Sequence, residues 1–576
     1  MFINGENRIL YIKINGEFLP IGCLTGDSFS ETVEMLNTTT RDNAGWATST
    51  PTTQSYNISF EGLVINTTLI TVGDTTKVSY DRLKELKRNR TLIEWKSEDV
   101  DKTFVDSGKG YITELSDSSS IDEFISFNAS IVGYGKPNET SFITTWRTTT
   151  NNETIVIGLD SSEIYNFRVD WGDNTNQIVT GNSNLSHTYS VPGDYLVKIN
   201  GIFPRIIMSE SNTTPENLIS INNWGAIQWK NMSFAFKNCI NLYNCNTQDV
   251  PDLSNVTNLL SMFENAGSNT SNLFINNINK WDTKNITKIS SMFKDATSFN
   301  QNINAWDVSN VTSMIYVFDN ATSFNQPLNN WNTGNVINMF AMFRGATSFN
   351  QDLSLWNVSN VIGTHQMFKN ATSFNQLLNS WETNTYSTTS NIQNMSSMFE
   401  NAIRFEANLN LWDTSGATNI NYMFRNINET GGIIEVSNWD VSNVTQARFA
   451  FAYNPLSSLD LSDWDTSSMT NIEGMFQGTD VYNFLTNIEK WNMSNVLFAF
   501  AFMSSYDGYE PKFPLAVYDD ILIAFANETF HTTPTNLSIH FGESQYTTAG
   551  SASRGKLTNP VSSGGFGWTI TDGGPV

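Results

Sequence analysis

The sequence predicts a multidomain, mostly β protein whose larger part is a solenoid of short repeats. The chain has 576 residues, more than one hydrophobic core usually organises. Tryptophan recurs every 25 residues from Trp281 to Trp381, and then at intervals of 31, 27, 25 and 27 residues as far as Trp491. Such a period is typical of stacked repeat arrays. We therefore expect four regions, over residues 1–137, 138–204, 205–513 and 514–576.

The composition argues against several classes of protein. Hydrophobic residues make up 39%, aromatic residues 12% and charged residues only 15%, which suits folded β structure rather than disorder. The formal charge of −24 argues against a protein that binds nucleic acid by neutralising its phosphates. Cys23, Cys239 and Cys245 form neither a CxxC zinc pattern nor a disulfide framework, so we expect buried thiols. Because the sequence lacks a long apolar run and a signal-peptide pattern, neither a membrane segment nor secretion is expected.

Residues 1–137 are expected to form short strands around one helix. Apolar residues alternate or cluster over strand-length windows in ILYIKI, YNISFEGLVI and DEFISFNASIVGYG. The segment Ser79–Asn89 predicts the helix, with Leu83 and Leu86 on one face and Ser79 or Asp81 as its N-cap.

A long polar segment, Ser30–Thr53, predicts a functional or assembly loop. It overlaps the motif GCLTGDSFSETVEMLNTTTRDNAGW (Gly22–Trp46). After this motif come YNISFEGL, the single helix and GYITELSDSSSIDEFISFNASIVGYG (Gly110–Gly135). With these motifs the first quarter of the chain resembles the major tail tube proteins of long-tailed bacteriophages. The resemblance implies a β-sandwich or barrel with a flanking helix, six copies of which form a ring, and a loop that reaches a neighbouring ring. An unrelated small β domain is the alternative.

Residues 138–204 are expected to form a small second β domain. Tyr165–Gly201 contains a strand, the turn WGDN, a second strand, the Pro-Gly turn of SVPGDY and a final strand. It resembles a PKD-type immunoglobulin-like module. Asp170, Asp173 and Asp194 suggest either a metal site or, as we favour, turns in which each aspartate bonds its own backbone.

The repeat unit is represented by FNQNINAWDVSNVTSMIYVFDNATS (Phe299–Ser323). INAWDV matches L-x-x-L-x-L, the strand of a leucine-rich repeat, and SNVTSMIYVF predicts a Ser-capped helical turn. The residues expected to point into the core are Ile303, Trp306, Val308, Val311, Met314, Val317 and Phe318. The motifs MFxxATSFNQ and WDVSNVT, in about eleven turns, are similar to the BspA-type, or DUF285, leucine-rich repeats, which implies an α/β solenoid over 205–513 with a C-terminal cap over 514–576.

The residue after each tryptophan is the main candidate for binding. Since neighbours on a strand alternate sides, it is expected to project from the concave face in a column of side chains about 4.8 Å apart. The column consists of Asp282, Asp307, Asn332, Asn357, Glu382, Asp413, Asp440, Asp465 and Asn492. It predicts a surface for sugars or basic groups or a weak cation site, unless each side chain folds back onto the following turn. The tryptophans and the Met-Phe clusters are expected in the core.

No motif predicts catalysis. His187, His365, His531 and His540 lie far apart in the sequence and form no HExxH motif. The sequence also lacks GxSxG, a P-loop and a GxGxxG in strand-to-helix context. We therefore expect no enzyme activity, catalytic residue, cofactor or metal.

The tail-tube resemblance implies a virion structural protein, made in the host cytoplasm and built into the phage tail. Its N-terminal domain is expected to form stacked rings around a channel through which DNA passes without specific binding. Its partners would be itself, other tail proteins such as tape measure and terminator proteins, and host-surface glycans bound by the outer domains. The alternative is a bacterial surface adhesin, because BspA-type repeats and PKD modules are common in such proteins.

Overall fold

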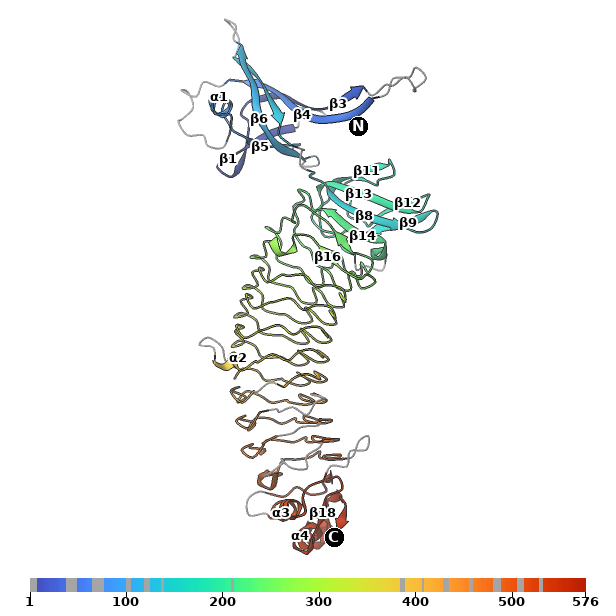
Figure 1. Ribbon diagram of the computed structural model, residues 1–576, viewed down its shortest axis with the longest axis vertical. Helices are drawn as coiled ribbons and strands as arrows, with labels where there is room; N and C mark the ends of the chain where they lie inside the picture. Colours follow the sequence, from blue (N-terminus) through green and yellow to red (C-terminus); the bar gives the residue numbers. More distant parts are fainter. Residues whose placement is uncertain are drawn as a thin grey trace.

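The computed structural model describes most of the chain, and the statements below concern that part alone. The described residues are 8–37, 49–64, 77–99, 105–118, 125–135, 139–208, 212–383, 389–406, 409–427, 435–454, 459–479, 488–504, 512–527 and 532–576. The chain is mostly β, with several sheets and few helices. Coils of chain stack along the long axis, with the sheets of the N-terminal part at one end and the helices α3 (Leu515–Phe525) and α4 (Thr548–Thr558) at the other (Figure 1).

The N-terminal region forms a seven-stranded antiparallel sheet in the order β2-β1-β5-β6-β7-β4-β3. Its strands are β1 (Arg8–Ile14), β2 (Glu17–Pro20), β3 (Leu24–Asn37), β4 (Ser49–Leu63), β5 (Ile93–Asp99), β6 (Val105–Ser118) and β7 (Ser126–Gly133). The sheet bends into half of a barrel (Figure 1). The sandwich or closed barrel implied by the resemblance is therefore not formed by the described residues of one chain, because β2 and β3 end the strand order.

One helix, α1 (Tyr80–Arg88), packs against this sheet, as the sequence predicts. The Ser79 hydroxyl accepts a hydrogen bond from the N–H of Arg82 at 3.3 Å, so Ser79 is the N-cap. Leu83 and Leu86 are buried among strand residues, in a core separate from that of the rest of the chain.

The prediction of a loop over Ser30–Thr53 is wrong at both ends. Residues 30–37 belong to β3 and residues 49–53 to β4, and the two strands pair as far as Asn37 opposite Ser49. Residues 38–48 lie outside the described residues. A ladder of backbone hydrogen bonds does not need apolar side chains, so a polar composition did not reveal the two long strands.

The second region contains a five-stranded sheet in the order β11-β10-β13-β8-β14 and a two-stranded sheet. The strands are β8 (Phe142–Thr148), β9 (Glu153–Ile157), β10 (Asn166–Asp170), β11 (Asn176–Val179), β12 (Leu185–Tyr189), β13 (Gly193–Ile202) and β14 (Leu218–Asn223). The edge strand β14 follows the 3₁₀ turn η3 (Pro215–Asn217) and leads directly into the coils. The core between these sheets continues without a break into the coils. The likeness to a PKD-type module stays a prediction.

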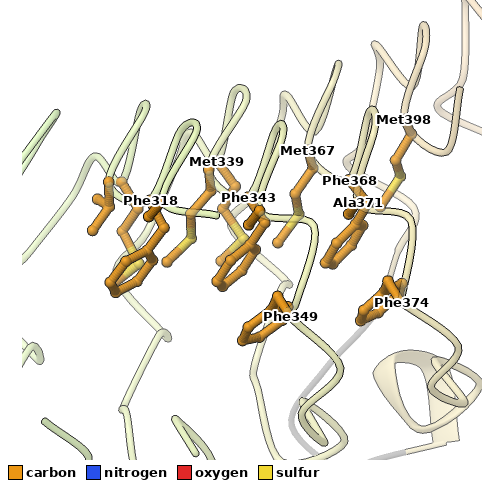
Figure 2. Close-up of a cluster of buried hydrophobic side chains, with 14 of the residues drawn as sticks. Phe318, Met339, Phe343, Phe349, Met367, Phe368, Ala371, Phe374 and Met398 are labelled. Atoms are coloured by element: carbon orange, nitrogen blue, oxygen red, sulfur yellow. The ribbon is translucent and has the colours of Figure 1, made fainter. Parts of the chain in front are cut away.

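The coils bury the residues that the repeat pattern assigns to the core. Ile303, Trp306 and Val308 are each at most 3% exposed, and Met314 and Phe318 are fully buried. Figure 2 shows the corresponding Phe and Met side chains of successive coils pointing into one shared interior. The ring of Phe343 stacks on those of Phe318 and Phe368 at centroid distances of 5.5 and 5.6 Å. Each coil thus completes the core of its neighbours.

The predicted strand and helical turn of the repeat are wrong. The Trp306 segment forms turns, and the bridges between coils lie in the segment predicted to be helical, as between Ser313 and Asn338. There the N–H of Tyr316 donates to Phe340 O of the next coil at 3.0 Å, whereas the N–H of Asp319 turns back to Tyr316 O at 3.2 Å. Because Tyr316 has a left-handed φ of 58°, an α-helix cannot continue through it.

Short elements interrupt the coils, and a cap ends them. Within the coils are β15 (Asn244–Cys245), β16 (Phe274–Ile275), η4 (Ile278–Lys280), α2 (Ser380–Thr383) and η5 (Ile488–Lys490). After them, α3 and α4 pack together with β17 (Ser538–His540), β18 (Gln545–Tyr546), η6 (Val561–Ser563), β19 (Thr569–Thr571) and β20 (Gly574–Pro575). The N–H of Met503 donates to His540 O at 2.9 Å, so this segment extends the ladder of the last coil.

The cysteines meet the prediction in part. Cys239 and Cys245 are buried, and burial raises the pKa of both thiols. Cys23 is exposed in the turn before β3, with a left-handed φ of 55°, so the expectation of a buried thiol is wrong there. None of the described helices is long and apolar enough to cross a membrane.

Candidate functional site

The nine residues that follow the tryptophans are exposed or half-buried and occupy equivalent places in successive coils. Eight of them accept a hydrogen bond from the backbone N–H two residues further along the chain. The pairs and their distances are Asp282 with Lys284 (3.4 Å), Asp307 with Ser309 (2.9 Å), Asn332 with Gly334 (3.2 Å), Asn357 with Ser359 (3.0 Å), Asp413 with Ser415 (3.0 Å), Asp440 with Ser442 (3.0 Å), Asp465 with Ser467 (3.0 Å) and Asn492 with Ser494 (2.9 Å). Glu382 instead accepts from the N–H and hydroxyl of Thr389 at 2.7 and 2.8 Å. These side chains fold back onto local backbone, and ligand binding by the column stays a prediction.

An ion pair and local hydrogen bonds stabilise charged carboxylates in this column. An ion pair of 2.7 Å with Lys284 lowers the pKa of Asp282. The hydroxyl and N–H of Ser467 lower the pKa of Asp465. Among the described residues, no group of three His, Cys, Asp or Glu side chains is placed to hold a metal ion.

The tryptophan rings are buried and join neighbouring coils, as expected of core residues. The indole N–H of Trp331 donates to Ile303 O at 3.1 Å, and that of Trp356 donates to Leu328 O at 2.9 Å. Trp331 is 2% exposed and Trp356 is fully buried. Their faces are therefore closed to a sugar.

The asparagine of the SNVT motif is also used inside the stack. Asn310 Nδ2 donates to Lys284 O at 2.7 Å, and Asn335 Nδ2 donates to Ser309 O at 2.7 Å. The regular polar residues of the repeat thus bond one coil to the next. A ligand site is better sought where the chain departs from the repeat pattern.

The aspartates of the second region are also turn and sheet residues. Asp170 and Asp173 each accept a backbone N–H two residues on, at 3.0 Å. Asp194 pairs with Arg147 on the neighbouring strand β8. This geometry agrees with the turn interpretation of Asp170 and Asp173 and places Asp194 in an ion pair.

A cavity of about 400 Å³ lies where the second region meets the first coils. We call it the junction cavity. It is lined by Arg147, Thr149, Glu153, Glu216, Asn217, Ile219, Asn241, Tyr243, Asn269 and Thr270. The antiparallel pairing of β8 with β14 brings the sheet residues and the coil residues together.

Hydrogen bonds fix the sheet side of the junction cavity. Glu153 accepts from the N–H groups of Thr149 (2.7 Å) and Thr150 (2.9 Å). Asn217 Nδ2 donates to Glu153 at 2.6 Å. Burial by itself would raise the pKa of Glu153, but these donors outweigh it and lower the pKa to about 2. Arg147 forms a two-point ion pair with Asp194, with distances of 2.7 and 2.8 Å.

The coil side of the junction cavity carries amides and an aromatic ring. Asn269 Nδ2 donates to Asn241 Oδ1 at 2.8 Å, and Asn241 Nδ2 donates to Glu216 O at 2.8 Å. The Tyr243 side chain is 41% exposed and lies beside Arg147.

Sequence reasoning missed the junction cavity, although the chain departs from the repeat pattern shortly after the cavity residues Asn269 and Thr270. Leu273 bridges Phe299, so Phe274 stands where the FNQ motif has Asn300. Asn300 Oδ1 accepts the N–H of Asn325 at 3.0 Å, whereas Phe274 is a 36% exposed ring. The exposed Tyr243 lies in the coil before Phe274.

Comparison with solved structures finds nine matching chains. Two of them are similar to 24% of this chain, both at 18% identity and a TM-score of 0.20. One is the tail of an empty gene transfer agent particle with C6 symmetry, of which 99% is covered. The other is the virion of a native gene transfer agent particle, of which 97% is covered. Among curated proteins, none matches the chain.

A protein-family model described as Mycoplasma protein of unknown function, DUF285, matches the coils in four overlapping or adjoining stretches. They are residues 208–314, 267–381, 382–453 and 427–509. Together they extend over residues 208–509, more than half of the 576 residues. The chain therefore belongs to the DUF285 family of proteins of unknown function.

Proposed function

We propose that this protein is a major tail tube subunit of a phage-type virion, whose N-terminal sheet assembles with other copies into stacked, hexameric rings. The open sheet is the observation that supports the proposal. Its end strands β2 and β3 each have a neighbour on one side only among the described residues, and β3 is 14 residues long. Long unpaired edges invite strand pairing with another chain. Head-to-tail pairing around a closed ring would satisfy every such edge.

The outer face of the sheet supports a role in lining a DNA channel. Ser59 lies opposite Ser28 on one neighbouring strand and Ser130 on the other, and Glu61 and Glu114 share the same hollow of about 430 Å³. A hydroxyl-rich, acidic surface repels phosphate, so DNA would slide past without specific binding. Tape measure and terminator proteins would be the other partners within the tail.

The second region and the coils would then lie outside the tube as decoration. We propose that they form one solenoid that contacts the host surface or its glycans. Many weak sites repeated along a tube act by avidity, so each needs only low affinity. We propose no catalytic role and no cofactor, and we place the protein in the virion.

Electron microscopy of the purified chain tests this proposal. The full-length protein is compared with a fragment that ends near Lys136, which contains a complete hydrophobic core of its own. We expect hollow tubes or stacked rings from both, thicker for the full-length chain. Dispersed single particles from both, even with a tail initiator complex added, would contradict the proposal.

A bacterial surface adhesin is the second candidate. The DUF285 match lies entirely in residues 208–509 and leaves the N-terminal sheet outside it, so under this alternative the coils would carry the function. Under this alternative, full-length protein that forms no tubes would still bind intact host cells, and the fragment of the N-terminal sheet would not. Tube formation by the fragment would exclude it.

A further inference from the structure

We propose that the junction cavity binds a neutral sugar unit of an oligosaccharide, with the Tyr243 ring as its stacking surface. The inference deepens the decoration role proposed above and rests on it only for the biological source of the sugar. The cavity volume of about 400 Å³ lies within the range of about 300–1,000 Å³ usual for small-ligand sites.

The charges around the junction cavity favour a neutral ligand. The single cationic side chain in its described lining, Arg147, is neutralised by Asp194. The Glu153 carboxylate is occupied by two N–H groups and the Asn217 amide. A phosphate or sulfate would find no free cation here, and the exposed Glu216 would repel it.

The remaining polar groups suit a ligand rich in hydroxyl groups. Asn241, Asn269 and Thr270 offer both donors and acceptors at the cavity wall. A sugar hydroxyl donates and accepts at once, so it pairs with such mixed groups. The amides of Asn241 and Asn269 are already aligned by their mutual hydrogen bond of 2.8 Å, which lowers the entropy cost of ordering them around a ligand.

Tyr243 supplies a fixed aromatic surface. Its N–H donates to Ile219 O at 3.2 Å and its carbonyl accepts the N–H of Phe274 at 2.8 Å, so the backbone is held on both sides. An exposed ring is costly to leave in water, and the C–H face of a sugar can cover it while the Tyr243 hydroxyl stays beside the Arg147 guanidinium.

The amides of Asn241 and Asn269 bond one coil to the next, as Asn300 and Asn310 do in the regular coils. At the junction cavity these amides lie beside the exposed Tyr243 ring, which lines the same cavity. An aromatic surface next to amide groups is therefore available to a ligand here.

The test is binding of neutral disaccharides to the full-length chain in solution. The probes are maltose, cellobiose, lactose and N,N′-diacetylchitobiose, with a sulfated disaccharide as the anionic control, measured by saturation-transfer NMR and calorimetry. We expect at least one neutral probe to bind. Tyr243→Ala should weaken it by about tenfold or more, whereas Tyr243→Phe, which keeps the ring, should change it by less than about threefold.

Two further variants keep the result decisive. Asn269→Ala removes an amide from the cavity wall and should also weaken binding. It serves as the second variant if Tyr243→Ala does not fold. Asp413→Ala alters the column after the tryptophans and should leave binding unchanged.

Three results would overturn the inference. They are no binding by any neutral probe, binding of the sulfated probe alone, and binding that Asp413→Ala abolishes but Tyr243→Ala does not. Because the measurement uses unassembled chains, a negative result leaves the tube proposal standing, and failed tube formation leaves the sugar site standing.

Discussion

The carboxylate of Asp319 is fully buried and is held by the guanidinium of Arg344 from the next coil. Two parallel hydrogen bonds join them, Nε to Oδ1 at 2.8 Å and Nη2 to Oδ2 at 2.7 Å. Burial raises the pKa of Asp319, and the guanidinium opposes this shift. Arg344 also donates to Gln366 of the following coil at 2.9 Å. One side chain thus fixes the register of three coils.

Replacing Arg344 with alanine should lower the free energy of unfolding by about 3 kcal/mol, because it leaves the Asp319 charge buried without a partner. Urea denaturation followed by circular dichroism measures this. Lys284→Ala, which breaks the exposed pair with Asp282, is the matched control and should have no measurable effect. If the double variant Asp319→Leu with Arg344→Met were no more stable than Arg344→Ala, the unpaired charge would not be the cause.

Glu153 should make stability depend on acid pH. Its pKa of about 2 in the folded chain lies below its usual 4.5, so its contribution is present above pH 4.5 and is lost as the pH falls through 2. The difference in melting temperature between the natural chain and Glu153→Gln should therefore be largest near neutral pH and shrink steadily below pH 4.5. A difference that stays constant from pH 7 to about 2 would contradict this.

Adjacent prolines in β3 should separate folding from assembly. Successive N–H groups of a strand point to opposite sides, so either Ser30→Pro or Glu31→Pro removes a hydrogen bond to β4, and the other removes only an outward N–H. We expect one variant to lose stability and the other to fold normally but form no tubes. Thermal melts and electron microscopy measure the two effects. Normal tubes from both variants would show that this edge is not the contact.

Deleting one whole coil should leave the protein folded. Removal of residues 326–350, which is 25 residues (350 − 326 + 1), joins Asn325 to Gln351 and restores the FNQ motif. Each coil contacts mainly its neighbours, so one interface is lost while the core stays continuous. Lys369, 25 residues after Arg344 by subtraction, would then face Asp319.

The matched control for this deletion removes residues 326–337, about half a coil. This deletion puts every later coil about half a turn out of phase with the earlier coils, so buried positions no longer stack on buried positions. We therefore expect loss of the cooperative melting transition. Equal melting of the two deletion variants would argue against stacking of equivalent coils.

Much of the core could be predicted from the sequence. The 25-residue spacing identified Trp306 and Trp331 as buried, and the Met and Phe positions around Met314 and Phe318 as core. The N-cap of α1 could also be predicted, because Ser79 accepts the N–H of Arg82 only three residues further along the chain. These features depend on which side chains avoid water and which can cap a nearby N–H, and both are properties of short stretches of chain.

The backbone of the coils was decided by the tertiary structure. Turns whose N–H groups bond three residues back produce a burial period close to that of a helix, so the sequence pattern around Met314 fitted both. What separates them is the N–H of Tyr316, which bonds Phe340 of the next coil. That hydrogen bond exists only when the coils are stacked.

The candidate sites were likewise predictable from the sequence in part and decided by the tertiary structure in part. The sequence located Asp307 and Asp440 after their tryptophans, but whether they face outward or accept a local N–H depends on the backbone angles that follow. The junction cavity arises because β14 pairs with β8, some 70 residues earlier in the chain. Local preferences determine burial and caps, whereas pairing between distant segments has no local signal, because its free energy comes from contacts that only the folded chain can make.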